Sequence, residues 1–184
     1  MRLLFFAFML PILSLSQSLS KLDQKNGFKS FRLGDSFDTW SSYVYFEKDW
    51  GDGEKTYVYN GECCKDLYGV KIQKIVLGFR QNKLVRINVA FEVPSYHGTY
   101  DIILKKLEGE FGKSSFEKNE WKYKESDYEY QKRISYRNEW VGEKISMVLD
   151  FDNSDYFQYP ELGQRLYIFI YKSEPRITKD DDGF

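Results

Sequence analysis

The 184-residue sequence contains only two cysteines, one histidine and four prolines, and its charges nearly cancel at a formal net charge of −1. Two cysteines cannot supply the disulfide framework on which many small secreted domains depend. The lack of a basic excess argues against binding to a nucleic-acid backbone, because duplex-binding proteins usually concentrate Lys and Arg on one face. We therefore expect neither a disulfide-stapled scaffold nor a nucleic-acid partner.

A single histidine also limits the catalytic schemes. Ser-His-Asp or Cys-His catalysis would have to use His97, which stands in the polar stretch 95–98 between an expected strand and an expected helix. No Gly-x-Ser-x-Gly elbow is present, and the stretch 51–53 is too short and too acidic to cradle a phosphate. Because acidic residues are abundant, composition leaves open a catalytic pair of carboxylates.

Long apolar runs are absent except at the amino terminus. There, Met1-Arg2 precedes an apolar run from Leu3 to Leu13, which the small residues Ser14 and Ser16 follow. This order is typical of a secretory signal peptide, and the run is too short to span a bilayer, which takes about 20 residues. We predict cleavage after Ser16, so that residues 1–16 are the signal peptide and 17–184 a single secreted domain. The alternative is that this run is a buried core helix.

The two cysteines, Cys63 and Cys64, are neighbours in the sequence. A bond between neighbours closes a strained eight-membered ring and constrains little of the unfolded chain, so it cannot staple the fold. We expect the two side chains to point to opposite faces of a turn or strand. A vicinal disulfide and an intermolecular bridge are the alternatives, and a metal site is the least favoured because His97 lies far away in sequence.

Two acidic stretches resemble metal-binding loops only superficially. The stretch 150–155 lacks the turn glycine and the final glutamate of a calcium loop, so we expect a solvated turn after a strand. Asp49, Asp52 and Glu54 flank glycines that suit an ordinary tight loop equally well. We predict no metal site and no cofactor.

Alternation of apolar and polar residues predicts a series of strands. Residues 84–93 alternate with a period of two, residues 70–79 form the preceding strand with a bulge near 73–74, and the polar stretch 80–83 links the two as a hairpin. The remaining strands are expected around 43–46, 57–59, 121–123, 134–140, 145–151 and 166–171. The last run is apolar on both faces, which indicates a central strand.

One helix is expected between the two groups of strands. Thr99 is its expected cap and Gly112 its end, and an apolar stripe recurs at helical spacing at Tyr100, Ile103, Leu104, Leu107 and Phe111. The expected fold class is α+β: an antiparallel β-sheet with this one main amphipathic helix, about 99–112, and a short N-terminal helix packed on one face. Because a helix-like segment precedes a hairpin in each half of the chain, an internal duplication is an open alternative.

Several short patterns resemble a known type of protein. They are Phe31–Ser36, the strand 75–79 with Asn82–Leu84, Phe111–Lys113, and Trp140–Gly142. Together they resemble small secreted bacterial proteins of unassigned function whose helix-plus-three-strand units are similar to those of the beta-lactamase inhibitor protein and of the small lipoprotein of the outer-membrane assembly machine. The chain lacks the lipid-attachment cysteine of that lipoprotein after the expected cleavage point. The resemblance implies no catalytic group.

The aromatic content is high, with 15 Tyr, 15 Phe and 4 Trp. Tyrosine combines a rigid apolar ring with a polar tip, which suits surfaces that recognise proteins or sugars. Strand-rich domains also favour aromatic residues for packing alone. The candidate ligand-binding residues are the tyrosines that alternation places beside polar neighbours: Tyr43, Tyr45, Tyr57, Tyr59, Tyr128 and Tyr130.

These observations predict a secreted bacterial protein, periplasmic or extracellular, that acts as a binding or accessory module without a catalytic role. The expected partner is a protein or glycan of the cell envelope. The alternative is a carboxylate-based hydrolase acting on envelope glycans. That alternative would require a cleft with two carboxylates about 5 to 10 Å apart, one of them with a raised pKa.

Overall fold

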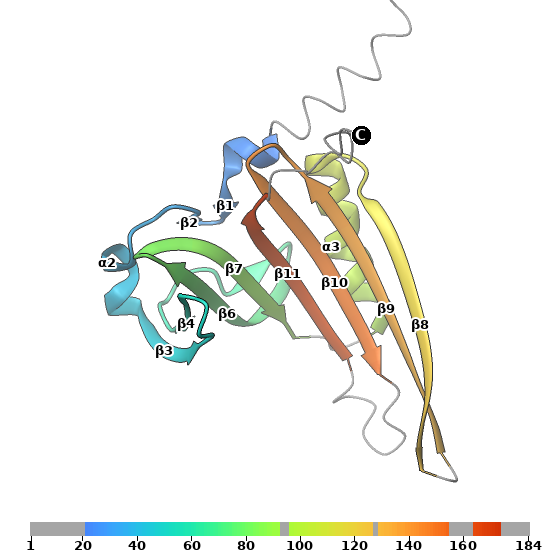
Figure 1. Ribbon diagram of the computed structural model, residues 1–184. Helices are drawn as coiled ribbons and strands as arrows, with labels where there is room; N and C mark the ends of the chain where they lie inside the picture. The colour runs from blue at the N-terminus through green and yellow to red at the C-terminus, as the bar shows by residue number, and fades with distance from the viewer. Residues whose placement is uncertain (1–20, 93–95, 127–128, 155–163, 174–184) are drawn as a thin grey trace, which may run out of the picture.

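The computed structural model describes residues 21–92, 96–126, 129–154 and 164–173 (Figure 1). The predicted signal peptide, 1–16, and the acidic tail, 179–184, lie outside these residues. The described elements are the helical residues 21–25, β1 (Gly27–Phe28), β2 (Phe31–Arg32), α2 (Phe37–Trp40), the 3-10 helix η1 (Ser41–Tyr43), β3 (Val44–Asp49), β4 (Glu54–Tyr59), β5 (Asp66–Leu67), β6 (Val70–Arg80), β7 (Lys83–Phe91), α3 (Tyr96–Phe111), β8 (Ser115–Ser126), β9 (Glu129–Val141), β10 (Ile145–Ser154) and β11 (Gln164–Lys172).

Of the described strands, nine form one antiparallel sheet that consists of two similar halves, and β1 and β2 pair with each other in a separate two-stranded sheet. The order along it is β3-β4-β6-β7-β11-β10-β9-β8, with β5 paired to β6. Each half is a meander that follows a helix, and the last strands of the halves, β7 and β11, pair in the middle of the sheet, where Val89 lies opposite Ile168. The repeated order supports the interpretation of an internal duplication, and it confirms β11 as a central strand.

The β6–β7 hairpin follows the sequence prediction closely. Its two turn residues, Gln81 and Asn82, have φ of 49° and 63°, the left-handed conformation that two-residue hairpin turns of right-twisted strands require. The pairing of β6 with β7 shifts register between Ile72 and Lys74, so the predicted bulge is confirmed. The shift changes which residues of β6 face the core beyond this point.

One face of the sheet is covered and carries the core. The helix α3 lies against this face over the second half of the sheet (Figure 1). The N-terminal segment packs beside it: residues 22–28 lie against α3, β10 and β11, and the rings of Phe31 and Phe37 pack on the first half. Trp140 is 1% exposed, and its Nε1 donates a 2.8 Å hydrogen bond to the carbonyl of Gly112 just after α3. The buried positions of α3 are Thr99, Tyr100, Ile103, Leu107 and Phe111. Leu104 is only partly buried.

Two polar contacts fasten the N-terminal segment to the rest of the fold. The carboxylate of Asp23 accepts three backbone N–H bonds, of 2.8 to 3.1 Å, from residues 143–145 in the β9–β10 turn. Glu110 of α3 accepts a 2.6 Å hydrogen bond from Lys25 Nζ and a 2.7 Å bond from the hydroxyl of Tyr68. Each contact joins segments that are distant in sequence, so both stabilise the covered face of the sheet.

The predicted α+β class is wrong, because the structure is mostly antiparallel β-sheet with short helices. The expected N-terminal helix is reduced to the four residues of α2, none of which is buried. The strands β8 and β9 have 12 and 13 residues, far longer than the stretches expected around 121–123 and 134–140. Their frequent charged residues hid the alternation on which the sequence prediction relied.

Three local predictions also need correction. The helix α3 begins at Tyr96, so Thr99 lies inside it, 6% exposed, and is not its cap. Residues 150–154 belong to β10, so the expected turn there is instead the end of a strand. Cys63 and Cys64 form a disulfide with each other, which was the alternative to separate packing.

No helix in the described residues is long and apolar enough to cross a membrane.

Candidate binding groove

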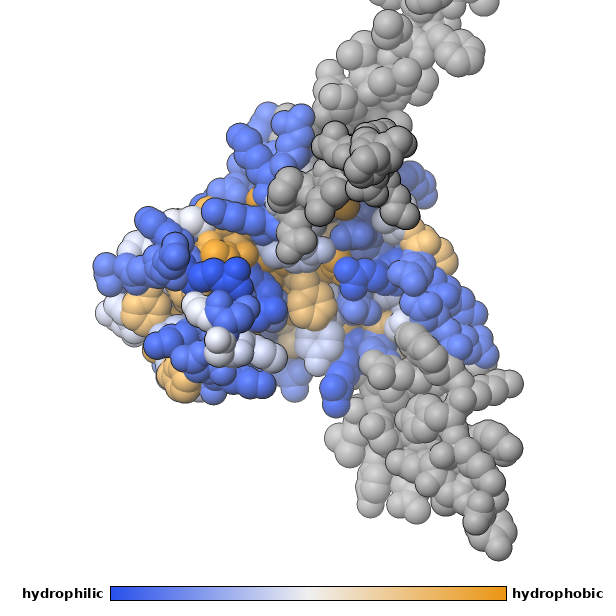
Figure 2. Space-filling view, viewed as in Figure 1, coloured by the Kyte–Doolittle hydropathy of each residue, from blue (hydrophilic) through white to orange (hydrophobic). Residues whose placement is uncertain are grey.

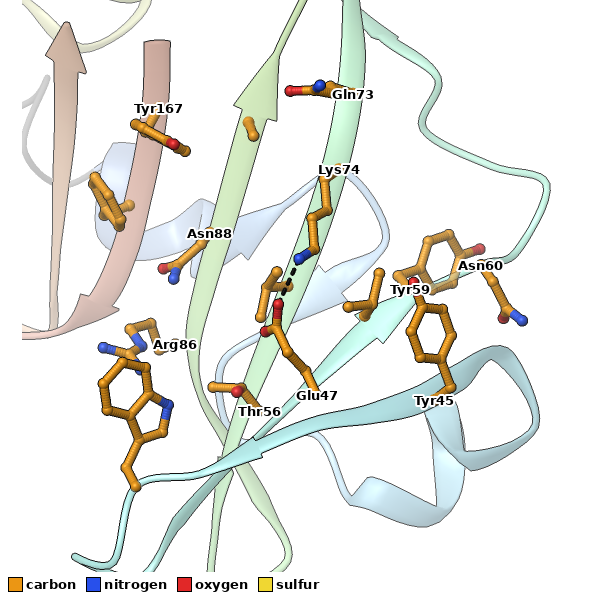
Figure 3. A pocket seen from close by; sticks show the side chains of 15 residues that line it. Tyr45, Glu47, Thr56, Tyr59, Asn60, Gln73, Lys74, Arg86, Asn88 and Tyr167 are labelled. Atoms are coloured by element: carbon orange, nitrogen blue, oxygen red, sulfur yellow. Dashed lines mark hydrogen bonds and ion pairs between the residues drawn. The ribbon is translucent and has the colours of Figure 1, made fainter. Parts of the chain in front are cut away.

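A groove of about 610 Å³ crosses the face of the sheet opposite α3 (Figure 3). Its volume falls within the roughly 300–1,000 Å³ that is usual for small-molecule sites. In β7 and β11 the groove residues alternate with core residues, since successive side chains of a strand point to opposite faces. The residues that line it are Tyr45, Glu47, Trp50, Thr56, Val58, Tyr59, Asn60, Gln73, Lys74, Val76, Arg86, Asn88, Ala90, Tyr167 and Phe169.

The space-filling view shows this open face (Figure 2). An apolar patch lies at the middle of the sheet, and polar side chains surround it. The groove residues with wholly apolar side chains are Val58, Val76, Ala90 and Phe169, and charged and amide side chains line the groove as well. The groove therefore offers both apolar contact and hydrogen-bonding groups.

Arg86 is held in the floor of the groove by a carboxylate from two strands away. Glu54 Oε1 lies 2.6 Å from Arg86 Nη2, and the Glu54 side chain is 11% exposed. The two residues sit on β4 and β7, and Gly78 of β6 lies between them in register with Arg86. A Cβ at Gly78 would come within 2.4 Å of Glu54 Oε1, so the absence of a side chain at this position allows the ion pair to form across β6.

Two groups in the groove floor lack hydrogen bonds. Within the described part of the chain, neither Arg86 Nε nor Asn88 Oδ1 has a hydrogen-bond partner, although both atoms are buried. Glu54 Oε1 is also without a hydrogen bond, because its approach to the guanidinium has the distance of an ion pair but not the angle of a hydrogen bond. Buried polar atoms are nearly always satisfied in folded proteins, so unsatisfied ones mark places where water or a ligand completes the set.

Aromatic rings border the groove on both sides. Tyr45 and Trp50 lie at the β3 side and are 55% and 53% exposed. Trp50 lies under two cations, with Lys48 Nζ 3.9 Å and Arg86 Cζ 5.7 Å from the ring centroid. Tyr167 and Phe169 of β11 border the other side, with ring centroids 5.6 Å apart. Such large exposed rings, gathered at one site, are typical of recognition surfaces.

The charges of the groove are paired internally. Glu47 of β3 forms an ion pair with Lys74 of β6 across β4, as the dashed line in Figure 3 shows. Arg86 pairs with Glu54. The charged side chains that line the groove are Glu47, Lys74 and Arg86. With the Glu54 carboxylate beside Arg86, their formal charges sum to zero.

The structure brings two of the six candidate tyrosines to the groove. Tyr45 and Tyr59 both line it, and they lie close together at one end in Figure 3. The Tyr59 ring also packs edge-on against Phe31, with centroids 5.0 Å apart, so it joins the core to the groove. Tyr43, in η1, is 52% exposed but does not line the groove.

The other three candidate tyrosines do not line the groove in the described residues. Tyr57 points to the covered face, where its ring lies 4.8 Å from that of Phe37 and 5.8 Å from that of Phe79. Tyr130 belongs to β9, in register with Lys124 of β8. Tyr128 lies outside the described residues. The sequence prediction of a binding role stays a prediction for all six tyrosines.

The Cys63–Cys64 disulfide lies in the loop that leaves the groove. Tyr59 and Asn60 line the groove and immediately precede this loop, and the Tyr59 hydroxyl donates a 3.2 Å hydrogen bond to Cys63 Sγ. Cys64 has a φ of 68° and is partly buried against the core. The disulfide therefore helps to fix one end of the groove.

Sequence reasoning missed most of the groove. Arg86 and Asn88 occupy the polar face of the alternating stretch 84–93, but alternation gives no sign of which residues of other strands line the same groove. Tyr167 and Phe169 were read as part of an apolar central strand. Trp50 lies outside every expected strand, so alternation gives no sign of its role. The available signal was the shared alternation of Arg86-x-Asn88 and Tyr167-x-Phe169, which places two pairs on one face of adjoining strands.

The described carboxyl groups whose pKa departs clearly from the ordinary value all shift in the same direction. Among the described carboxyl groups with a resolved shift, those of Asp52, Glu62 and Glu110, the pKa is lowered in each case. At Asp52 the first cause is the hydrogen bond from the backbone N–H of Glu54. A general acid needs a raised pKa. Within the described residues, no group of three or more His, Cys, Asp or Glu side chains could hold a metal ion.

No protein-family model matches the chain, and no curated protein matches it at a significant level. Among solved structures, it is similar to an extracellular protein containing an SCP domain from Bacillus anthracis str. Ames, with a TM-score of 0.35 and 19% sequence identity. The similarity covers 80% of this chain and 51% of that protein, so the chain spans about half the length of the protein it matches. A similarity of this level establishes neither a shared fold nor a shared function.

Proposed function

We propose that this chain is a secreted, non-enzymatic binding protein of the bacterial envelope or the extracellular space, and that its ligand lies in the groove opposite α3. The proposed location rests on the signal-peptide pattern of residues 1–16. The proposed site rests on the groove itself. It is the place where exposed aromatic rings and unsatisfied polar groups meet.

The observation that carries the proposal is the pair of unsatisfied groups in the floor. Leaving a buried polar atom without a partner costs about 1–3 kcal/mol, which a fold tolerates where another molecule makes the missing bond. Arg86 Nε and Asn88 Oδ1 sit two residues apart on the same face of β7, so one ligand in the groove would be close to both.

The hydrolase alternative has less support. The two carboxylates nearest the groove floor, Glu47 and Glu54, are each paired with a cation. Both side chains are therefore already engaged with a lysine or an arginine of the protein itself. We therefore do not propose a glycosidase pair in this groove.

The resemblance to proteins built of helix-plus-three-strand units stays a proposal, and each half of this sheet has one strand more than such a unit. Each half of the sheet consists of a helix followed by an antiparallel meander, β3-β4-β6-β7 and β8-β9-β10-β11. Such a duplication would produce one continuous sheet with a broad open face. The resemblance concerns architecture and does not by itself name a ligand.

Binding to envelope material tests the proposed function. Purified protein is incubated with insoluble envelope material from the producing bacterium, and the bound fraction is measured after sedimentation. The groove variant carries Arg86→Met and Asn88→Leu. The control carries Arg137→Met, which removes an arginine from the same sheet, 4.0 Å from the Asp150 carboxylate and outside the groove.

We expect wild type and the control to sediment with the envelope material and the groove variant to stay in solution. Circular dichroism verifies that all three proteins are folded. Equal sedimentation of all three proteins, or of none, would contradict the proposal. Amino-terminal sequencing of the exported protein should find a start at or near Gln17, whereas a retained Met1 would contradict secretion through a cleaved signal peptide.

A further inference from the structure

We propose that the groove is selective for a neutral saccharide. This inference rests on the proposed function, because it names the class of ligand for the same groove. Three properties of the lining support it: the cancelled charge, the planar polar side chains and the aromatic rings. Each property matches one feature of an uncharged sugar, which has hydroxyl groups around its edge and apolar C–H faces.

The charged side chains of the groove are already paired within the protein, which disfavours ligands that bind through ion pairs. Lys74 and Arg86 each already have a carboxylate partner, Glu47 and Glu54 respectively. An anionic ligand would have to compete with Glu54 for Arg86, and a cationic ligand would have to compete with Lys74 for Glu47. Displacing a partner from a partly buried pair leaves a charge uncompensated, which is unfavourable. An uncharged ligand avoids that penalty.

The planar polar side chains supply the hydrogen bonds that hydroxyl groups need. Asn60, Gln73 and Asn88 line the groove from three different segments: the end of β4, β6 and β7. Each amide offers an acceptor oxygen and two N–H donors side by side. A hydroxyl group is both a donor and an acceptor, so vicinal hydroxyls of a sugar fit such amides. Arg86 Nε adds a donor that the protein leaves unused.

The aromatic rings suit the C–H faces of a sugar. Tyr45 and Trp50 present more than half of their surface to solvent at one side, and Tyr167 and Phe169 border the other side. Rings of this kind bury apolar surface while their polar atoms stay available. The cations beside Trp50 restrict the indole, which lowers the entropy lost when a ligand packs against it.

An extended peptide fits this surface less well. The groove lies on the face of a sheet, where β4, β6 and β7 already use their backbone groups in the ladder with each other. A peptide main chain would therefore find no free strand edge along the groove floor, and strand addition is the usual way to satisfy it. The recognising groups are side chains, which suits a ligand whose polar groups are also on its periphery.

Titration of the full-length secreted protein with defined ligands tests the inference. Three sets are used: neutral oligosaccharides of glucose, mannose, xylose and N-acetylglucosamine; acidic oligosaccharides of uronic acids; and uncharged, capped tripeptides. Binding is followed by chemical shifts of backbone amides. We expect neutral oligosaccharides to shift signals from β6 and β7, and the two other sets to leave those signals in place.

Variants connect binding to the named side chains. Asn88→Leu keeps the approximate shape of the side chain and removes its hydrogen bonds, so affinity for the neutral sugar should fall by about tenfold or more. Asn60→Ala, at an exposed rim position, and Trp50→Ala should each weaken binding as well, and they test the inference if Asn88→Leu does not fold. Arg137→Met is the control and should bind like wild type.

The outcomes separate the inference from the proposed function. If acidic oligosaccharides or peptides shift the groove signals and neutral sugars do not, the class of ligand is wrong but the groove is still a binding site. If neutral sugars bind and the groove variants bind as tightly as wild type, the location is wrong. If no ligand of any set shifts the groove signals, and the envelope material also fails to retain the protein, both the inference and the proposed function are contradicted.

Discussion

Replacing Gly78 with alanine tests the packing beneath the groove. Gly78 lies in β6 between Glu54 of β4 and Arg86 of β7, with an extended backbone that alanine adopts without strain. On backbone grounds alone, Gly78→Ala should stabilise the strand by roughly 0.5–1 kcal/mol, because glycine loses more conformational freedom on folding. The new methyl group, however, would lie 2.4 Å from Glu54 Oε1.

The contact with Glu54 decides whether Gly78→Ala raises or lowers the free energy of unfolding. The Glu54 carboxylate can rotate away at little steric cost, but it then leaves Arg86, whose side chain is 32% exposed. Separating a buried ion pair costs about 3–5 kcal/mol, and partial exposure of this pair favours the lower end. Subtracting the backbone gain of about 1 kcal/mol leaves an expected net loss of about 2 kcal/mol in the free energy of unfolding.

Urea unfolding followed by circular dichroism measures this loss. In a Glu54→Ala background only the 3.3 Å approach to Arg86 Cβ remains, so adding Gly78→Ala should then cost much less than it does in the wild type. The difference between the two backgrounds is the coupling between the methyl group and the carboxylate. If Gly78→Ala is as stable as wild type, or more stable, in both backgrounds, then the Glu54–Arg86 pair does not stabilise the sheet as argued.

Three further predictions concern the core and the polar contacts. Changing both Cys63 and Cys64 to Ser should lower the free energy of unfolding by about 1 kcal/mol at most, because a bond between neighbours constrains little of the unfolded chain; a loss above about 3 kcal/mol in urea would contradict this. Leu107→Ala in the buried stripe of α3 should cost about 2–5 kcal/mol, and Lys105→Ala on its exposed face almost nothing, so equal melting temperatures would show that the stripe is not core. Burial raises the pKa of Glu110, but the hydrogen bonds from its lysine and tyrosine partners and the nearby lysine charges lower it by more, so it ends below the ordinary 4.5. The carboxyl group therefore binds its proton more tightly in the unfolded chain than in the folded one. Its contribution to stability is present above about pH 4.5 and is lost as the pH falls further. The free energy of unfolding of Glu110→Gln should accordingly change less with pH in the acid range. A series that falls as steeply in the variant would refute that role for the carboxylate.

Sequence patterns predicted the strands in which apolar and polar residues alternate strictly. They failed for strands in which charged residues interrupt that alternation. The hairpin of β6 and β7, including its bulge, follows from residues whose apolar side chains recur every second position. The strands β8 and β9 carry charged residues at 11 of their 25 positions, so only the short stretches around 121–123 and 134–140 have a readable pattern. Their full length comes from pairing with each other along the whole hairpin, which no local pattern encodes. The α+β assignment failed for that reason.

The candidate site was predictable only in part, because it is assembled by the sheet and not by a motif. Tyr45 and Tyr59 were correctly placed beside polar neighbours, yet the same rule selected Tyr57, whose ring packs on the covered face. Alternation identifies two faces but not which of them is open. Asn88 and Phe169 become neighbours through the pairing of β7 with β11, and such long-range pairing is not legible in local sequence.

The position of β7 and β11 in the middle of the sheet has a consequence for how the chain folds. Both strands end their halves, and Val89 meets Ile168 about 80 residues further along the chain. Hairpins such as β6–β7 need only local contacts and form within microseconds, whereas the central ladder must wait until nearly the whole chain is available. Until then, the backbone groups of β7 that later pair with β11 are free, and the apolar side chains on one face of β7 lack their partners from β11. A chain that ends before β11 should therefore aggregate through β7, and the closing of this ladder should set the folding rate.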